Sequence, residues 1–137
     1  MKNNPQTENE LTYELEEEYE LSLDNNDSNI SLLVKHDYYA SDSEHGRELL
    51  SAFIRALSQT GRLDHIFLVD SGVKILDPGH FAYSSLMDAA GSKETCITVC
   101  SDSISYYGIS LETVLDVVDK DTFFSLLIYQ QNLIISE

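Results

Sequence analysis

The sequence predicts a single three-layer α/β domain in which helices cover both faces of a mostly parallel, five-stranded sheet. Short apolar runs of strand length alternate along the chain with segments in which apolar residues recur every three or four positions. Strands that alternate with helices need crossover connections, and such connections produce a parallel sheet. The length of 137 residues fits one domain, and 42% hydrophobic residues suffice for a core.

Five short segments are expected to form the strands, because each is apolar. They are also rich in β-branched residues, which suit a pleated surface. Four further segments are expected to be helices. In the first helix Leu49, Leu50, Phe53 and Leu57 recur at helical spacing, and Gly61 ends it. The expected strands cover 30–36, 63–70, 95–100, 115–118 and 133–135, and the expected helices cover 44–60, 81–90, 102–107 and 122–130.

The first 29 residues differ in composition from the rest of the chain. They hold nine acidic residues and one basic residue, including the run Glu16-Glu17-Glu18. High charge with few apolar residues is typical of disorder, so residues 1–29 are expected to be an acidic disordered tail and 30–137 the folded domain. From Tyr19 to Leu23 apolar and polar residues alternate, which leaves a short edge strand as the alternative there.

Charge and composition exclude several classes of function. The formal net charge is −16, from 24 acidic against 8 basic residues, which argues against a nucleic-acid partner because phosphate binding needs Lys and Arg. No apolar run is long enough to span a membrane, and the N-terminus has no apolar leader, so no membrane association and a cytoplasmic location are expected. The two cysteines are then expected to stay reduced.

The sequence indicates neither a metal site nor a nucleotide cofactor. Cys96 and Cys100 lack companion Cys and His ligands at the spacings that zinc sites use. The glycine-rich patterns that bind the phosphates of nucleotides are absent from the chain. No metal and no cofactor are therefore expected.

The stretch from Thr95 to Gly108 carries the candidate catalytic residue, Cys100. It begins as a β-branched strand, and residues 101–103 then supply helix-capping oxygens. Cys100 is therefore expected at the carboxyl end of a strand, directly before a short helix, where sites of open α/β sheets form. A thiol beside a helix N-terminus is favoured as the thiolate, the reactive form. The alternative is a buried cysteine that packs as a small hydrophobic residue.

Residues at the other strand ends are expected to lie at the same edge of the sheet as Cys100. His36 and Asp37 end the first strand. His36 would favour the thiolate or shuttle a proton; the alternative is a histidine in water at the rim. Ser71 and Gly72, after the second strand, would present backbone N–H groups to an anion, although a plain turn explains them equally well.

Two residues near Cys100 have other expected roles. Asp102 works against a thiolate, because a neighbouring carboxylate disfavours a second negative charge. Cys96 shares the strand face of Cys100 and is expected to lie deeper in the sheet, as a core residue.

Three segments of the chain resemble DsrE/DsrF-like proteins, most closely the C-terminal domain of the YedF group, which is linked to selenium metabolism. Segment 40–54 is similar to the loop and first helix of that group, and segment 66–74 to its second strand and Asn-Ser-Gly-Val-Lys turn. Segment 99–108 resembles its Cys-Gly-Thr-Cys-Leu-Asp-Tyr-Tyr-Gly element. The resemblance covers residues 30–136.

The resemblance implies a flavodoxin-like sheet in a homo- or hetero-oligomer and a sulfurtransferase-like function. In sulfur-relay members the cysteine matching Cys100 accepts a persulfide from one carrier protein and passes it to another. Ser103 stands where the YedF element has its second cysteine, so a relay of sulfur or selenium through Cys100 alone is the expectation. The alternative is a non-catalytic module of the same fold that oligomerises or binds a partner.

Overall fold

The computed structural model describes residues 29–91, 95–111 and 115–137 of the chain. Within them five strands form one sheet in the order β4-β3-β2-β1-β5, and every neighbouring pair is parallel. The predicted α/β fold class is thus confirmed. The expected tail lies outside the described residues except for Asn29. The strands are β1 (Ile30–Val34), β2 (Leu63–Leu68), β3 (Cys96–Cys100), β4 (Asp116–Val118) and β5 (Leu133–Ser136).

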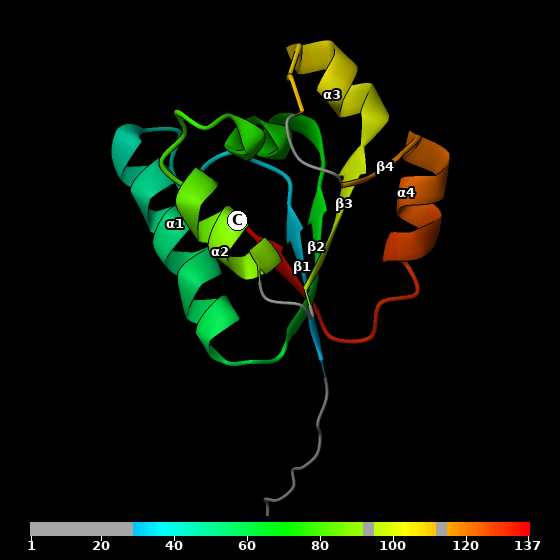
Figure 1. The fold of residues 1–137 in the computed structure, drawn as a ribbon, viewed down its shortest axis with the longest axis horizontal. Coiled ribbons are helices and arrows are strands. Elements are labelled where there is room, and N and C mark those ends of the chain that lie inside the picture. The colour runs from blue at the N-terminus through cyan, green and yellow to red at the C-terminus, as the bar shows by residue number, and fades with distance from the viewer. Residues whose placement is uncertain (1–28, 92–94, 112–114) are drawn as a thin grey trace, which may run out of the picture.

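Helices cover both faces of the sheet (Figure 1). α1 (Glu44–Gln59) and α2 (Tyr83–Gly91) lie on one face, and α4 (Lys120–Leu127) lies on the other. α3 (Ser101–Tyr107) extends beyond the carboxyl end of β3 instead of covering a face. It packs against η3 (Asp70–Leu76), a 3-10 helix that follows β2. α3 and η3 therefore form the carboxyl edge of the domain.

The strands divide the buried side chains into two clusters, because successive side chains of a strand point to opposite faces. Leu32 and Ile66 belong to the larger cluster, which α1 and α2 cover. Their neighbours Leu33 and Phe67 point the other way, into a smaller cluster. We call this second group the α4-side cluster; its buried members are Leu33, Phe67, Cys100, Phe123 and Leu127.

Capping residues determine where the helices begin and end. The Ser43 hydroxyl accepts a hydrogen bond from the Gly46 N–H at 3.0 Å and caps α1. The Asp119 carboxylate accepts from the Thr122 N–H at 2.8 Å and caps α4, and this hydrogen bond lowers the pKa of Asp119. Because Asp119 is the cap, α4 begins at Lys120, earlier than the expected Thr122. Gly108, at φ 64°, ends α3 as expected.

Strands β1 and β2 are shorter than the sequence suggests. β1 ends at Val34 and β2 at Leu68, whereas strands to 36 and 70 were expected. Asp70 has φ 53°, a left-handed conformation that turns the chain out of the strand and into η3. Among the described residues, no helix has the length and apolar character needed to cross a membrane.

Candidate functional site

Cys100 lies where the sequence places it along the chain, but its thiol is enclosed. It is the last residue of β3 and the N-cap of α3. Its exposed fraction is only 2%, because it packs in the α4-side cluster with Phe67 and Phe123. Within the described part of the chain its side chain makes no capping hydrogen bond. The expected position at a strand end is present, and solvent does not reach the thiol in this conformation.

The expectation that Cys96 is a core residue is wrong. Cys96 is exposed, whereas Cys100 is buried. The two residues share a strand face, but α4 covers only part of that face: Phe123 and Leu127 are its buried residues, and they pack in the cluster that holds Cys100. Burial of the two thiols therefore depends on where α4 lies across the sheet and not on the depth of each residue in its strand.

Asp102 and Ser103 connect α3 to its neighbours. The Ser103 hydroxyl accepts a hydrogen bond from the Asp70 N–H at 2.8 Å, which fastens α3 to η3. The Asp102 carboxylate accepts from the Lys120 backbone N–H at 3.1 Å and lies 3.5 Å from the Lys120 Nζ atom. Asp102 therefore joins the N-terminus of α3 to that of α4, the two helices that adjoin Cys100.

Close packing against β1 requires a glycine at position 72. A Cβ atom at Gly72 would lie 2.1 Å from the Val34 carbonyl oxygen, so only glycine fits there. Its N–H donates to the Val69 carbonyl at 3.0 Å and is not free to bind an anion. Instead of a plain turn, Ser71 and Gly72 belong to the 3-10 helix η3, and Ser71 is half-buried there.

His36 lies in the loop after β1, outside the cluster that holds Cys100. Its ring stacks on Tyr38, with the ring centroids 4.9 Å apart and the planes within 5°. The side chain is half-buried. The structure thus gives His36 an aromatic partner, and the cluster around Cys100 does not include it.

A buried charged group at the carboxyl edge is missing from the sequence interpretation. Asp37 follows β1 and is only 5% exposed. Its Oδ2 atom accepts from Arg47 Nε at 3.2 Å and from His80 Nε2 at 3.1 Å. Burial alone would lower the pKa of Arg47, but its hydrogen bonds and ion pairs with Asp37 and Asp42 outweigh burial and raise it. The sequence places Asp37 at a strand end but does not indicate these contacts, since Arg47 and His80 lie 10 and 43 positions away.

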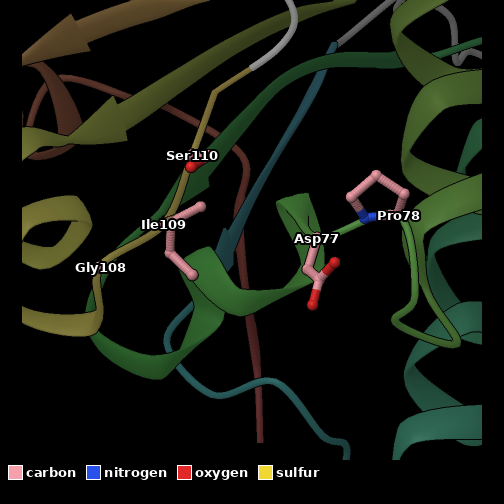
Figure 2. Close-up of a pocket in the computed structure, with 5 residues that line it drawn as sticks. All are labelled: Asp77, Pro78, Gly108, Ile109 and Ser110. Carbon is pink, nitrogen blue, oxygen red and sulfur yellow. The ribbon is translucent and has the colours of Figure 1, made fainter.

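Two neighbouring cavities open beside this group. One, of 360 Å³, is lined by Asp37, Lys74, Asp77, Gly79, His80, Tyr107 and Ile109. The other, of 260 Å³, shares Asp77 and Ile109 with it. Figure 2 shows Ile109 and Ser110 on one side of this second pocket and Asp77 and Pro78 on the other. Cys100 lines neither cavity.

His65 and Tyr107 are the aromatic residues whose acid–base properties the fold changes. The His65 ring is hydrogen-bonded to Thr98 Oγ1 at 2.7 Å and stacks on Phe67. Burial lowers the pKa of His65 and outweighs the negative charges of Asp64 and Asp116, which act to raise it. Tyr107 donates to Asp70 Oδ1 at 3.2 Å, and desolvation together with the Asp70 charge raises its pKa.

We expect His65 to make stability depend on pH. The pKa of His65 is lowered in the folded state. At pH values between this folded pKa and the ordinary value of about 6.5, the unfolded chain therefore binds more protons than the folded protein. The stabilising contribution of neutral His65 is therefore complete above about pH 6.5 and is lost as the pH falls toward the folded pKa. Urea unfolding of wild type and His65→Gln between about pH 7.5 and pH 5 measures it.

The informative quantity is the difference in unfolding free energy between the two proteins. Wild type should lose its advantage over His65→Gln as the pH falls through this range. A difference that stays constant with pH would show that His65 does not titrate abnormally.

No group of three or more His, Cys, Asp or Glu side chains that could hold a metal ion occurs in the described ranges. The carboxyl edge offers a shielded thiol, a buried carboxylate and a lysine beside a cavity. The thiol and the cavity are separate features of the edge, because the residues around them differ.

Comparisons with known proteins show a fold. No model of a known protein family matches the chain, and no curated protein matches it significantly. Among solved structures, the ychN protein from E. coli is similar, with a TM-score of 0.54 and 16% sequence identity; the match covers 79% of this chain and 98% of that one. At this level of identity the likeness shows the fold alone: the described residues share the α/β fold of the ychN protein, with a five-stranded parallel sheet and helices on both faces.

Proposed function

We propose that this chain is a DsrE-like carrier that receives a sulfane sulfur on Cys100 and passes it to a partner protein. In the receiving step the Cys100 thiolate attacks the outer sulfur of a donor persulfide. An S–S bond forms on Cys100, the donor S–S bond breaks, and the donor leaves as a thiolate, so no oxidant is consumed. Delivery repeats the exchange, with the acceptor thiolate as the attacking group. Selenium in place of sulfur would follow the same steps.

The position of Cys100 between two diverging connections carries this proposal. Cys100 ends β3 and pairs with Val118 at the end of β4. From β3 the chain continues into α3 at the carboxyl edge, and from β4 into α4 on the far face of the sheet (Figure 1). Ligand sites of open α/β sheets form where connections of neighbouring strands diverge in this way.

Burial of the thiol adds a condition, because a donor must reach it. α4 is the element that covers Cys100, and only Phe123 and Leu127 of its eight residues are buried. Local opening of α4, which exposes these two side chains, is the movement by which a donor would reach the thiol. The proposal therefore requires that α4 open locally in the folded protein and admit a donor persulfide to the Cys100 thiol.

We expect Cys100 to be loaded in the folded protein. Native Cys96→Ser protein, in which Cys100 is the remaining thiol, is incubated with glutathione persulfide and analysed by intact mass and by peptide mapping. The expected result is a gain of one sulfur atom on Cys100, at a rate well above that of global unfolding measured by urea jump under the same conditions. Global unfolding is the reference because it exposes any buried thiol.

Cys100→Ser is the matched control, because it keeps the exposed Cys96 and reports whether the reagent is active. It should load only at Cys96. Loading of Cys100 that occurs no faster than global unfolding would contradict the relay.

The burial of Cys100 favours one second candidate, a non-catalytic module of the same fold that oligomerises or binds a partner. In that case Cys100 packs as an apolar residue among Phe67, Phe123 and Leu127. Self-association that is unchanged in Cys100→Ser, measured by sedimentation velocity, together with absent loading, would support this candidate. Both candidates keep the expectations of a homo-oligomer and a cytoplasmic, reduced setting.

A further inference from the structure

The 360 Å³ cavity at the carboxyl edge has the chemistry of a binding site that is separate from Cys100. We call it the Lys74 cavity; it is lined by Asp37, Lys74, Asp77, Gly79, His80, Tyr107 and Ile109. These residues come from the loop after β1, from η3 and the turn after it, and from α3 and its C-terminal end. Groups from three separate stretches of the chain thus converge on one cavity.

Asp37 supplies a fixed carboxylate to this cavity. Its side chain is 7% exposed, and its Oδ2 atom is held by both Arg47 and His80. His80 is itself fixed, since its Nδ1 atom accepts from the Ala82 N–H at 3.0 Å while Nε2 lies 3.1 Å from Asp37. The neutral ring with its proton on Nε2 satisfies both bonds. Within the described residues no hydrogen bond reaches Asp37 Oδ1, so this oxygen is available to a bound donor.

Lys74 supplies a positive charge. Its Nζ atom lies 4.9 Å from the centroid of the Tyr107 ring, a cation–π arrangement that holds the ammonium in place. The Tyr107 hydroxyl in turn is fixed by Asp70 at 3.2 Å. Across the described ranges no carboxylate lies within salt-bridge distance of Lys74, although the chain carries three acidic residues for each basic one. Lys74 therefore retains its capacity to pair with an anion.

Asp77 adds a second carboxylate. Its Oδ1 atom accepts from the Gly79 N–H at 3.1 Å, an arrangement that orients the side chain at the mouth of the cavity. Ile109 supplies an apolar wall shared by both cavities (Figure 2). The Lys74 cavity thus combines one unpaired cation, two carboxylates and an apolar surface.

We infer that the Lys74 cavity binds a small zwitterion, a free α-amino acid, with its carboxylate on Lys74 and its ammonium on Asp37 and Asp77. A simple anion would meet the two carboxylates, and a simple cation would leave Lys74 without an anionic partner. A ligand that carries both charges complements all three groups. The cavity volume of 360 Å³ accommodates such a molecule with a modest side chain against Ile109.

Titration of ¹⁵N-labelled full-length protein with single L-α-amino acids, followed by amide NMR, tests this inference. At least one amino acid should produce saturable shifts, with a Kd on the order of 1 mM or tighter, at the amides of 74–77, 79–80 and 107–109. For each amino acid that binds, the α-hydroxy acid and the amine with the same side chain should bind at least about tenfold more weakly. Absence of saturable shifts with the whole panel, or equal binding of the hydroxy acid, would overturn the proposal.

Two variants locate the binding. Lys74→Met keeps the aliphatic stem and removes the charge, and Asp77→Asn removes an exposed carboxylate without touching the buried Asp37–Arg47 pair. Each should weaken binding about tenfold or more. Lys35→Met is the matched control, because it changes the net charge equally at a lysine that pairs with Glu137. If Lys35→Met weakens binding as much as Lys74→Met, the shifts report general charge and the assigned site is wrong.

This inference is independent of the proposed relay. The amino-acid titration is carried out on Cys100→Ser as well, where binding should be unchanged because Cys100 does not line the cavity. Loss of sulfur loading would then leave the cavity assignment standing, and absence of amino-acid binding would leave the relay standing.

Discussion

Replacement of Phe123 by alanine is expected to lower the free energy of unfolding by about 3–5 kcal/mol. Phe123 is fully buried, and its ring meets Phe67 edge-to-face at a centroid distance of 5.6 Å. Because it is one of two buried residues that hold α4 on the sheet, its truncation leaves a cavity beside Cys100. Urea unfolding followed by far-UV circular dichroism measures the loss.

The same variant tests how access to Cys100 is controlled. In a Cys96→Ser background, Phe123→Ala should raise the alkylation rate of Cys100 above that of the parent, while Phe123→Leu should give a smaller loss of stability of about 1–2 kcal/mol. Phe124→Ala is the control, because the neighbouring ring is 47% exposed and its loss should change both quantities little. Equal effects of Phe123→Ala and Phe124→Ala would contradict the anchoring role of Phe123.

Replacement of Gly72 by alanine is expected to cost about 3 kcal/mol of unfolding free energy. The added Cβ atom would lie 2.1 Å from the Val34 carbonyl oxygen and 2.8 Å from its carbonyl carbon. Both obstacles are backbone atoms of β1, so relief requires that η3 and β1 separate. Asp70 and Lys74 belong to the same η3 segment. We therefore also expect the amide NMR signals of residues 70–76 to shift in the Gly72→Ala protein.

Gly91→Ala is the control for this substitution, because a Cβ atom at Gly91 would meet no atom within 4 Å. Gly91 is the last residue of α2, where alanine is the better helix former, so the variant should be neutral or slightly stabilising. A Gly72→Ala protein as stable as Gly91→Ala would mean that the close approach to Val34 is absent in solution.

The fold class is predictable from the sequence because local patterns determine it. Apolar runs such as Leu32-Leu33-Val34 identify buried strands, and the helical spacing of Leu50 and Ile54 identifies the face of α1 that packs on them. Element ends are less predictable. Asp119 and Asp121 both suit an N-cap, and the extended backbone at Asp119 (ψ 169°), which depends on the turn after β4, decides between them.

The candidate site was less accessible to sequence reasoning, because tertiary packing determines it. The strand position of Cys100 followed from β-branched residues before it and capping residues after it, and the structure shows that position. The inverted burial of Cys96 and Cys100 depends on where α4 crosses the sheet, which the sequence of β3 does not encode. The contacts of Asp37 with Arg47 and His80 join side chains from the loop after β1, from α1 and from the turn after η3. No recurring spacing in the sequence indicates these contacts.

The place of β5 in the sheet has a consequence for how quickly the domain folds. β1 to β4 lie side by side in chain order, but β5 returns to pair with β1. The contacts that join these ends connect residues 99 and 103 positions apart, as in the hydrogen bonds of Ser31 with Gln130 and of Asn132 with Asn29. Closing a loop of that length costs more chain entropy than any of the neighbouring strand pairings. We therefore expect β5 to join the sheet last, and its arrival to limit the folding rate.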